Sequence, residues 1–138
     1  MKFISTLALL VAVLMPALAL IAPSPAHAQA IENDITALAD KSFSDKAEAV
    51  ERLAATGDPR VVPALQAFLD RRLYVRKSDG KVVIGEPKGK VVLIKDPLTL
   101  TEIEQAPKRS VKRIRINNRL RGTVRAAIGG LTLRSPDP

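Results

Sequence analysis

Residues 44–69, SDKAEAVERLAATGDPRVVPALQAFL, contain the clearest structural pattern in the chain. Ser44 is a residue type that caps helices, and small and aliphatic residues then recur on one helical face until Gly57. Asp58 and Pro59 have the order expected at the cap and first position of a second helix. The stretch therefore predicts two helices joined by a tight turn into an antiparallel hairpin. The apolar positions of the two faces are Ala47, Val50, Leu53 and Ala54, then Val62, Leu65, Phe68 and Leu69.

The residues on either side predict further elements. Apolar residues at helical spacing predict a short helix over 31–41, which completes a helical hairpin region at 29–72. The turn sequence Asp79-Gly80 lies between β-branched residues and predicts a β-hairpin within 73–95. The expected strands are 74–76 and 81–84, with a third at 90–94, and residues 85–89 are expected to form a loop.

Residues 96–116 have only a weak pattern and are expected to form a linker. Its carboxylates, Glu102 and Glu104, are spaced as on a solvated face; a general acid–base pair would need partner residues that the linker does not offer. Helical spacing returns in 117–134, where Gly129-Gly130 is typical of a helix end. The predicted fold is therefore mainly α with an inserted β-hairpin or three-stranded sheet, an α+β class.

Residues 1–28 have the features of an export signal: a basic start at Lys2, an uncharged apolar run over 3–21, and the small-residue cleavage sequence Ala26-His27-Ala28. Cleavage would leave residues 29–138 as a single small domain. An uncleaved membrane anchor is the alternative, because the apolar run is nearly long enough to span a bilayer. A buried core helix is a further alternative, but it would need neither a basic residue at its start nor the small residues Ala26 and Ala28 after it. We expect cleavage, since the prolines of the segment break the helix.

The residue types restrict the available chemistry. The chain has no cysteine, and its one histidine, His27, lies in the expected export signal. The remaining chain lacks the thiolate and imidazole groups that most often ligate transition metals or activate nucleophiles. We therefore expect a non-enzymatic protein with no cofactor and no metal site. Burial of apolar residues, rather than disulfides, must stabilise the fold.

Positive charge is concentrated at the end of the chain. Residues 29–107 contain 12 Lys and Arg against 13 Asp and Glu, whereas residues 108–138 contain 9 against Asp137 alone. Such a segment attracts anionic surfaces, although a solvated helix face with a flexible lead-in would have the same composition. Nucleic acid is a disfavoured partner, because no aromatic residue is interleaved for base stacking. The candidate interaction surface comprises Arg113, Arg115, Asn117, Asn118, Arg119, Arg121 and Arg125.

Several sequence blocks resemble a known family. Residues 49–60, with 63–69, resemble a HEAT-type helical repeat. Three later blocks extend this likeness: Tyr74-Val75-Arg76, Asp96-Pro97-Leu98-Thr99 and Asn117-Asn118-Arg119-Leu120-Arg121. Together, the blocks are similar in sequence and order to the N-terminal extracytoplasmic extension of bacterial urea ABC transporter permeases. These permeases belong to the branched-chain amino-acid permease family. The closing residues Ser135-Pro136-Asp137-Pro138 extend the likeness and have the form of a helix start, as in the front part of a longer permease. A terminus after an ordinary last helix is the alternative.

The resemblance implies an exported domain in the periplasm or on the periplasmic face of the inner membrane. Its function would be that of a docking module of a urea or amino-acid importer, as an extension, a truncated form or a stand-alone paralogue. The implied partners are the permease, ATPase and substrate-binding components. The alternative function is a stand-alone basic protein that binds anionic lipid or polyanions.

Overall fold

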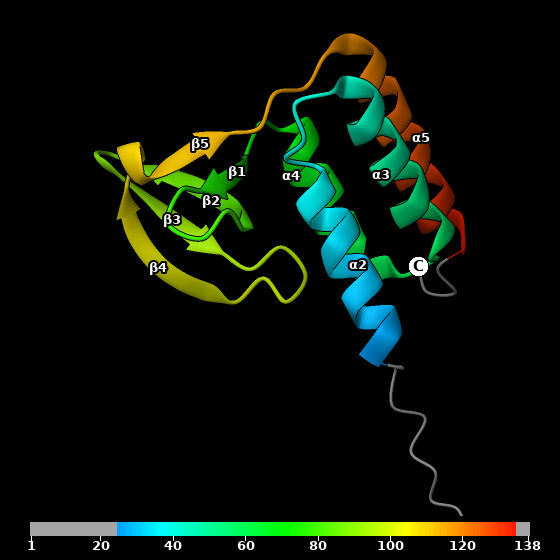
Figure 1. Ribbon diagram of the computed structural model, residues 1–138, viewed down its shortest axis with the longest axis horizontal. Coiled ribbons are helices and arrows are strands. Elements are labelled where there is room, and N and C mark those ends of the chain that lie inside the picture. The colour runs from blue at the N-terminus through cyan, green and yellow to red at the C-terminus, as the bar shows by residue number, and fades with distance from the viewer. Residues whose placement is uncertain (1–24, 135–138) are drawn as a thin grey trace, which may run out of the picture.

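The computed structural model describes residues 25–134, which form a helical part and an antiparallel sheet lying side by side (Figure 1). This arrangement confirms the predicted α+β class, but the sheet has five strands, not the two or three that were predicted. The helices are α2 (Pro25–Ala37), α3 (Phe43–Ala55), α4 (Val62–Leu69) and α5 (Asn118–Arg134), and the short 3-10 turns are η1 (Pro59–Val61) and η2 (Lys108–Ser110). The strands are β1 (Leu73–Arg76), β2 (Val82–Lys88), β3 (Val91–Lys95), β4 (Glu102–Pro107) and β5 (Val111–Arg113).

Both helices of the predicted hairpin are present, with capping interactions at their starts. The hydroxyl of Ser42, rather than the expected Ser44, accepts a hydrogen bond from the Asp45 N–H at 3.3 Å. A carboxylate oxygen of Asp58 accepts a hydrogen bond from the Arg60 N–H at 2.9 Å, as the sequence order predicts. The closely packed helix pairs are α2–α3, α3–α5 and α4–α5, so α5 covers both helices of the hairpin.

The sheet has the strand order β4-β3-β2-β1-β5 and all of its pairs are antiparallel. Strands β4 and β5 lie at opposite edges, yet only the three residues of η2 connect them. The sheet must therefore curl until its two edges approach one another. An ion pair between Arg76 of β1 and Glu104 of β4, with nitrogen and oxygen 3.4 Å apart, spans the curled face.

The curl divides the apolar residues into two cores. On the convex face, Leu73, Val82 and Ile84 pack with the helices in the larger core. The concave face has its own smaller core, which receives side chains from all five strands: Tyr74, Val83, Val92, Ile94, Ala106 and Val111. Strand β1 therefore contributes alternate residues to two different cores, which explains its nearly continuous apolar sequence.

Gly85 allows the smaller core to close. A Cβ atom at this position would lie 2.6 Å from Cδ2 of Tyr74 and 2.8 Å from Cγ1 of Val92. Both neighbours are buried, so neither ring nor methyl group has free space into which to move. The ring of Tyr74 thus packs directly against the backbone of β2.

The expected linker at 96–116 is wrong, because it contains β4, η2 and β5. Ala106 is the only buried residue of β4, so this edge strand lacks the alternation that marks a half-buried strand. The expected loop at 85–89 is also wrong: β2 continues to Lys88. Pro87 is tolerated there because β1 pairs with β2 only as far as Ile84, which leaves one side of β2 without a ladder.

The helix α5 continues through Gly129 and Gly130 to Arg134, as the predicted helix over 117–134 requires, although a glycine pair is typical of a helix end. Leu131 lies beyond the glycines and is buried in the larger core, so tertiary packing outweighs the low helix propensity of glycine.

The expected export signal lies mostly outside the described residues. Ala26-His27-Ala28 falls within the described part, where it forms the first turns of α2. The chain's closing Ser-Pro-Asp-Pro sequence also lies outside that part. Within residues 25–134, no helix combines the length and apolar character that crossing a bilayer requires.

We predict that Gly85→Ala lowers the free energy of unfolding by about 1–3 kcal/mol, because the added methyl group overpacks the smaller core. Urea denaturation of the two proteins would measure the difference. Gly122→Ala is the matched control: Gly122 is exposed within α5 with open space around it, and this change should stabilise the protein by about 0.5–1 kcal/mol. Equal effects of the two substitutions would contradict the packing of Tyr74 on Gly85.

Candidate interaction surface

The predicted surface residues follow the chain from the sheet into the helical part. Arg113 ends β5, Arg115 and Asn117 lie in the connection to α5, and the others lie on α5 itself. Arg113, Arg115, Asn118, Arg119 and Arg125 are exposed, whereas Asn117 and Arg121 are half-buried. The structure therefore places most of these charges in contact with solvent.

None of the described ion pairs involves the basic segment of residues 108–134. Eight pairs connect five cations with nearby carboxylates: Arg52, Arg60, Arg72, Arg76 and Lys95. None of them includes a Lys or Arg between residues 108 and 134, and the last acidic residue of the described part is Glu104. The positive field of residues 108–134 is therefore not neutralised by direct ion pairs within the described part of the chain.

Arg113 is positioned by an aromatic residue. It lies directly across from Tyr74 in the β1–β5 pairing, and its guanidinium donates a hydrogen bond to the Tyr74 hydroxyl at 3.1 Å. The guanidinium carbon lies 5.5 Å from the centre of the same ring, which is within the range of a cation–π interaction. These contacts fix the charge of Arg113 at the rim of the smaller core.

Arg115 is positioned by a buried lysine. Lys46 of α3 is 4% exposed, and its ammonium group donates a hydrogen bond to the backbone carbonyl of Arg115 at 2.9 Å. It also lies 4.9 Å from the centre of the Phe43 ring. Burial lowers the pKa of the Lys46 ammonium; nearby Asp40 acts in the opposite direction and Arg115 lowers it further. The connection between β5 and α5 is thus fastened to the start of α3.

Two neighbouring hollows share Arg113. The first, which we name the arginine hollow, has a volume of about 410 Å³ and is lined by Phe43, Arg71, Arg113, Ile114, Arg115 and Ile116. The second, the tyrosine hollow, has a volume of about 260 Å³ and is lined by Tyr74, Pro87, Val92, Lys108, Val111 and Arg113. Each combines apolar walls with cationic groups, and neither has a carboxylate among its lining residues.

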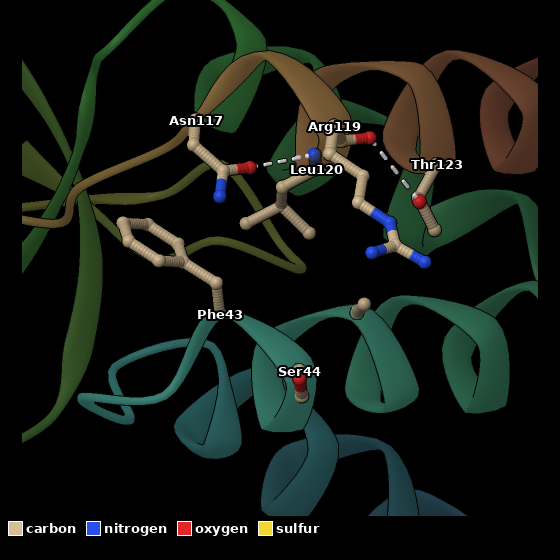
Figure 2. Close-up of a pocket in the computed structure, with 7 residues that line it drawn as sticks. Phe43, Ser44, Asn117, Arg119, Leu120 and Thr123 are labelled. Carbon is tan, nitrogen blue, oxygen red and sulfur yellow. Dashed lines mark hydrogen bonds between the residues drawn. The ribbon is translucent and has the colours of Figure 1, made fainter.

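A third hollow, of about 390 Å³, lies between the starts of α3 and α5. Figure 2 shows Phe43 and Ser44 at the start of α3 facing Asn117 and Leu120 at the start of α5, with the guanidinium of Arg119 turned toward the space between the helices. The side-chain oxygen of Asn117 accepts a hydrogen bond from the Leu120 N–H at 2.8 Å, which makes Asn117 the N-cap of α5. Asn117 therefore has a structural role.

The structure groups the predicted residues only in part. Arg113 and Arg115 meet at the arginine hollow, and Asn117 and Arg119 meet at the third hollow. The remaining predicted residues, Asn118, Arg121 and Arg125, line none of these hollows.

Sequence reasoning missed three residues that shape the surface. Lys46 lies four residues before Val50 and seven before Leu53, so its position on the buried helical face was visible in the spacing, although lysine is rarely buried. Arg71 lies outside the basic segment and joins the arginine hollow only through the fold. Tyr74 was identified as a strand residue, and no sequence signal pairs it with Arg113.

Comparison of the chain with protein-family models, with curated proteins and with solved structures finds no match. The likeness to importer permeases therefore stays a prediction from the sequence blocks. Among residues 25–134, no group of three or more histidine, cysteine or acidic residues is arranged to hold a metal ion.

Asn117 and Asn118 provide a matched pair of substitutions. We predict that Asn117→Ala lowers the free energy of unfolding by about 1 kcal/mol, because the first turn of α5 loses its cap. Asn118→Ala removes an exposed side chain one residue later and should change stability by less than about 0.5 kcal/mol. Thermal denaturation would compare the two variants, and an equal loss in both would argue against the capping role.

We predict that Lys46→Met destabilises the protein by about 1–3 kcal/mol at neutral pH, because the Arg115 carbonyl loses its buried donor. The effect should depend on pH. The folded pKa of Lys46 lies below the unfolded value of 10.5, so the unfolded chain binds more protons between the two values. Wild-type stability therefore gains a contribution that rises with pH through this window, and the variant lacks it.

Denaturation series at several alkaline pH values would measure this difference. Lys41→Met serves as the control, since Lys41 is exposed on the connection between α2 and α3. A constant gap between wild type and Lys46→Met across the window would contradict the buried position of the amine.

Proposed function

We propose that this chain is an exported, non-catalytic docking module of a urea or amino-acid ABC importer. The carrying observation is that the cations of residues 108–134 make no described ion pair and surround hollows with apolar walls. A surface of this kind is available for a partner with acidic and apolar groups. The sequence resemblance supplies the class of partner: the membrane permease or the substrate-binding protein of an importer that also contains the ATPase.

The described contacts also support a rigid presentation of this surface. Arg113 is held by Tyr74, and the backbone of Arg115 is held by Lys46. A pre-positioned surface loses less conformational entropy on binding than a flexible one, which favours docking. We propose the periplasm, or the periplasmic face of the inner membrane, as the site of this interaction.

A second candidate function is binding to anionic lipid or another polyanion. It is favoured by the same unneutralised charge, since basic clusters are attracted to anionic membrane surfaces. Cosedimentation with phosphatidylglycerol vesicles would test it. The binding should need the anionic lipid and should be lost as salt is added.

The docking function predicts a transport phenotype. Deletion of the gene should lower uptake of radiolabelled urea or of a branched-chain amino acid, and the full chain should restore it. A variant with Arg113, Arg115, Arg119 and Arg121 replaced by Gln should fail to restore uptake, because the partner loses its electrostatic contacts.

The control replaces the exposed lysines Lys41, Lys77, Lys81 and Lys90 by Gln, which removes the same charge from other parts of the surface. This variant should restore uptake as the wild type does. Normal uptake after deletion would contradict the importer role. Vesicle binding by the wild-type chain in that case would favour the second candidate.

A further inference from the structure

Strand β5 contributes residues to both hollows: Arg113 lines both of them, and Val111 lines the tyrosine hollow. Strand β5 is at the end of the sheet order, and within the described residues it pairs with no strand except β1. An unpaired strand edge offers backbone donors and acceptors to another extended chain. The question is therefore which of its backbone groups point outward and what surrounds them.

The hydrogen bonds to β1 define the outward groups. The Ile114 N–H donates to the Leu73 carbonyl at 3.0 Å, and the Ser110 carbonyl accepts from the Lys77 N–H at 2.9 Å. In an antiparallel pair, alternate residues face the partner, so residues 110, 112 and 114 bond with β1. The backbone groups of Val111 and Arg113 consequently face away from β1, toward the open edge.

The side chains next to this edge determine what an added strand would need. Three arginines, Arg71, Arg113 and Arg115, line the arginine hollow, and the Arg113 guanidinium lies against Tyr74 of the tyrosine hollow. Guanidinium groups pair well with carboxylates. Arg71 is kept at this position by a left-handed backbone conformation, with φ of 58°, directly after α4. The tyrosine hollow offers Tyr74, Val92 and Val111 to an apolar side chain.

We propose that the edge of β5 and its two hollows bind an extended acidic segment of a partner protein, which adds to the sheet as a further strand. Its backbone bonds with the outward groups of Val111 and Arg113. Its carboxylates contact the arginine hollow, and a neighbouring apolar side chain enters the tyrosine hollow. This inference rests on the proposed docking function and names the chemistry of the docked segment.

The shape of the surface favours a peptide over a membrane. The three arginines line a hollow to which β5 contributes Arg113, whereas a bilayer presents a broad surface. Of the four exposed large apolar side chains among the described residues, Phe43 lines the arginine hollow; the three that are more exposed, Leu100, Ile103 and Leu133, line neither hollow. Insertion into lipid would use those residues and would not need the hollows.

A fluorescein-labelled peptide of alternating Glu and Val residues is a direct probe for the full chain. Fluorescence anisotropy should detect binding that weakens with salt. A Gln-Val peptide should bind more weakly, because it lacks the carboxylates. A Glu-Val peptide methylated at every backbone nitrogen should also bind more weakly, because it keeps the carboxylates but has no N–H group on either edge for strand pairing.

The triple variant Arg71→Gln, Arg113→Gln and Arg115→Gln should weaken Glu-Val binding roughly tenfold, as expected for three partly screened charge contacts. The matched control replaces the exposed lysines Lys41, Lys81 and Lys90 by Gln, which removes the same charge outside both hollows. That control should bind nearly as well as the wild type. Hydrogen exchange gives a second measurement: the Arg113 amide should become protected when the peptide is added to the wild-type chain.

Several results would overturn the inference. Equal affinity for the methylated peptide would mean ionic attraction without strand addition, and equal affinity of the two triple variants would mean that the hollows are not used. Binding to phosphatidylglycerol vesicles without binding to the peptide would assign the charge to a membrane. If the triple variant of Arg71, Arg113 and Arg115 restores importer uptake in full, docking uses another surface; this inference then fails, but the proposed docking function does not. If deletion of the gene leaves uptake normal, the proposed docking function itself fails.

Discussion

The pairing of β5 with β1 is the interaction on which the rest of the structure depends. It extends the sheet beyond β1 and sets Arg113 against Tyr74 at the rim of the smaller core. Only residues 114–117 separate β5 from α5, so the same pairing determines where α5 begins. The hydrogen bond from Lys46 to the Arg115 carbonyl then fastens this connection to the helical part. The two parts of the molecule are joined at a place that also carries Arg113 and Arg115, neither of which makes a described ion pair.

The sequence allowed the fold class and the strongly patterned elements to be predicted. Helices α3 and α4 have one-sided apolar faces, and the β1–β2 turn has Asp79 and Gly80, whose positive φ of 72° at Gly80 suits glycine. The parts that were missed depend on distant contacts. Strand β4 is an exposed edge with no alternation, and the three residues of β5 are a strand only through their pairing with β1. Local pattern contains neither kind of information.

The candidate surface was predictable as a charged segment but not as a shape. The run of cations from 108 to 125 identified Arg113 and Arg115, and the structure gives them neighbours from α4's end and from β1. Asn117 was selected for its place in a sequence block, yet its hydrogen bond assigns it to helix capping. Charge composition therefore located the surface. To tell residues that are available for binding, such as Arg113, from residues with a structural role, such as Asn117, the contacts between elements were needed.

The late position of α5 has a consequence for the order in which the chain folds. The bond between Lys46 and Arg115 joins residues 69 positions apart, and Leu120 and Leu131 complete a core whose other walls come from residues much earlier in the chain. Closing such long loops costs entropy before their contacts form. During synthesis, the apolar faces of α3 and α4 remain incompletely covered until almost the last described residue has left the ribosome. The packing that covers these faces is therefore completed only when the basic end of the chain is present.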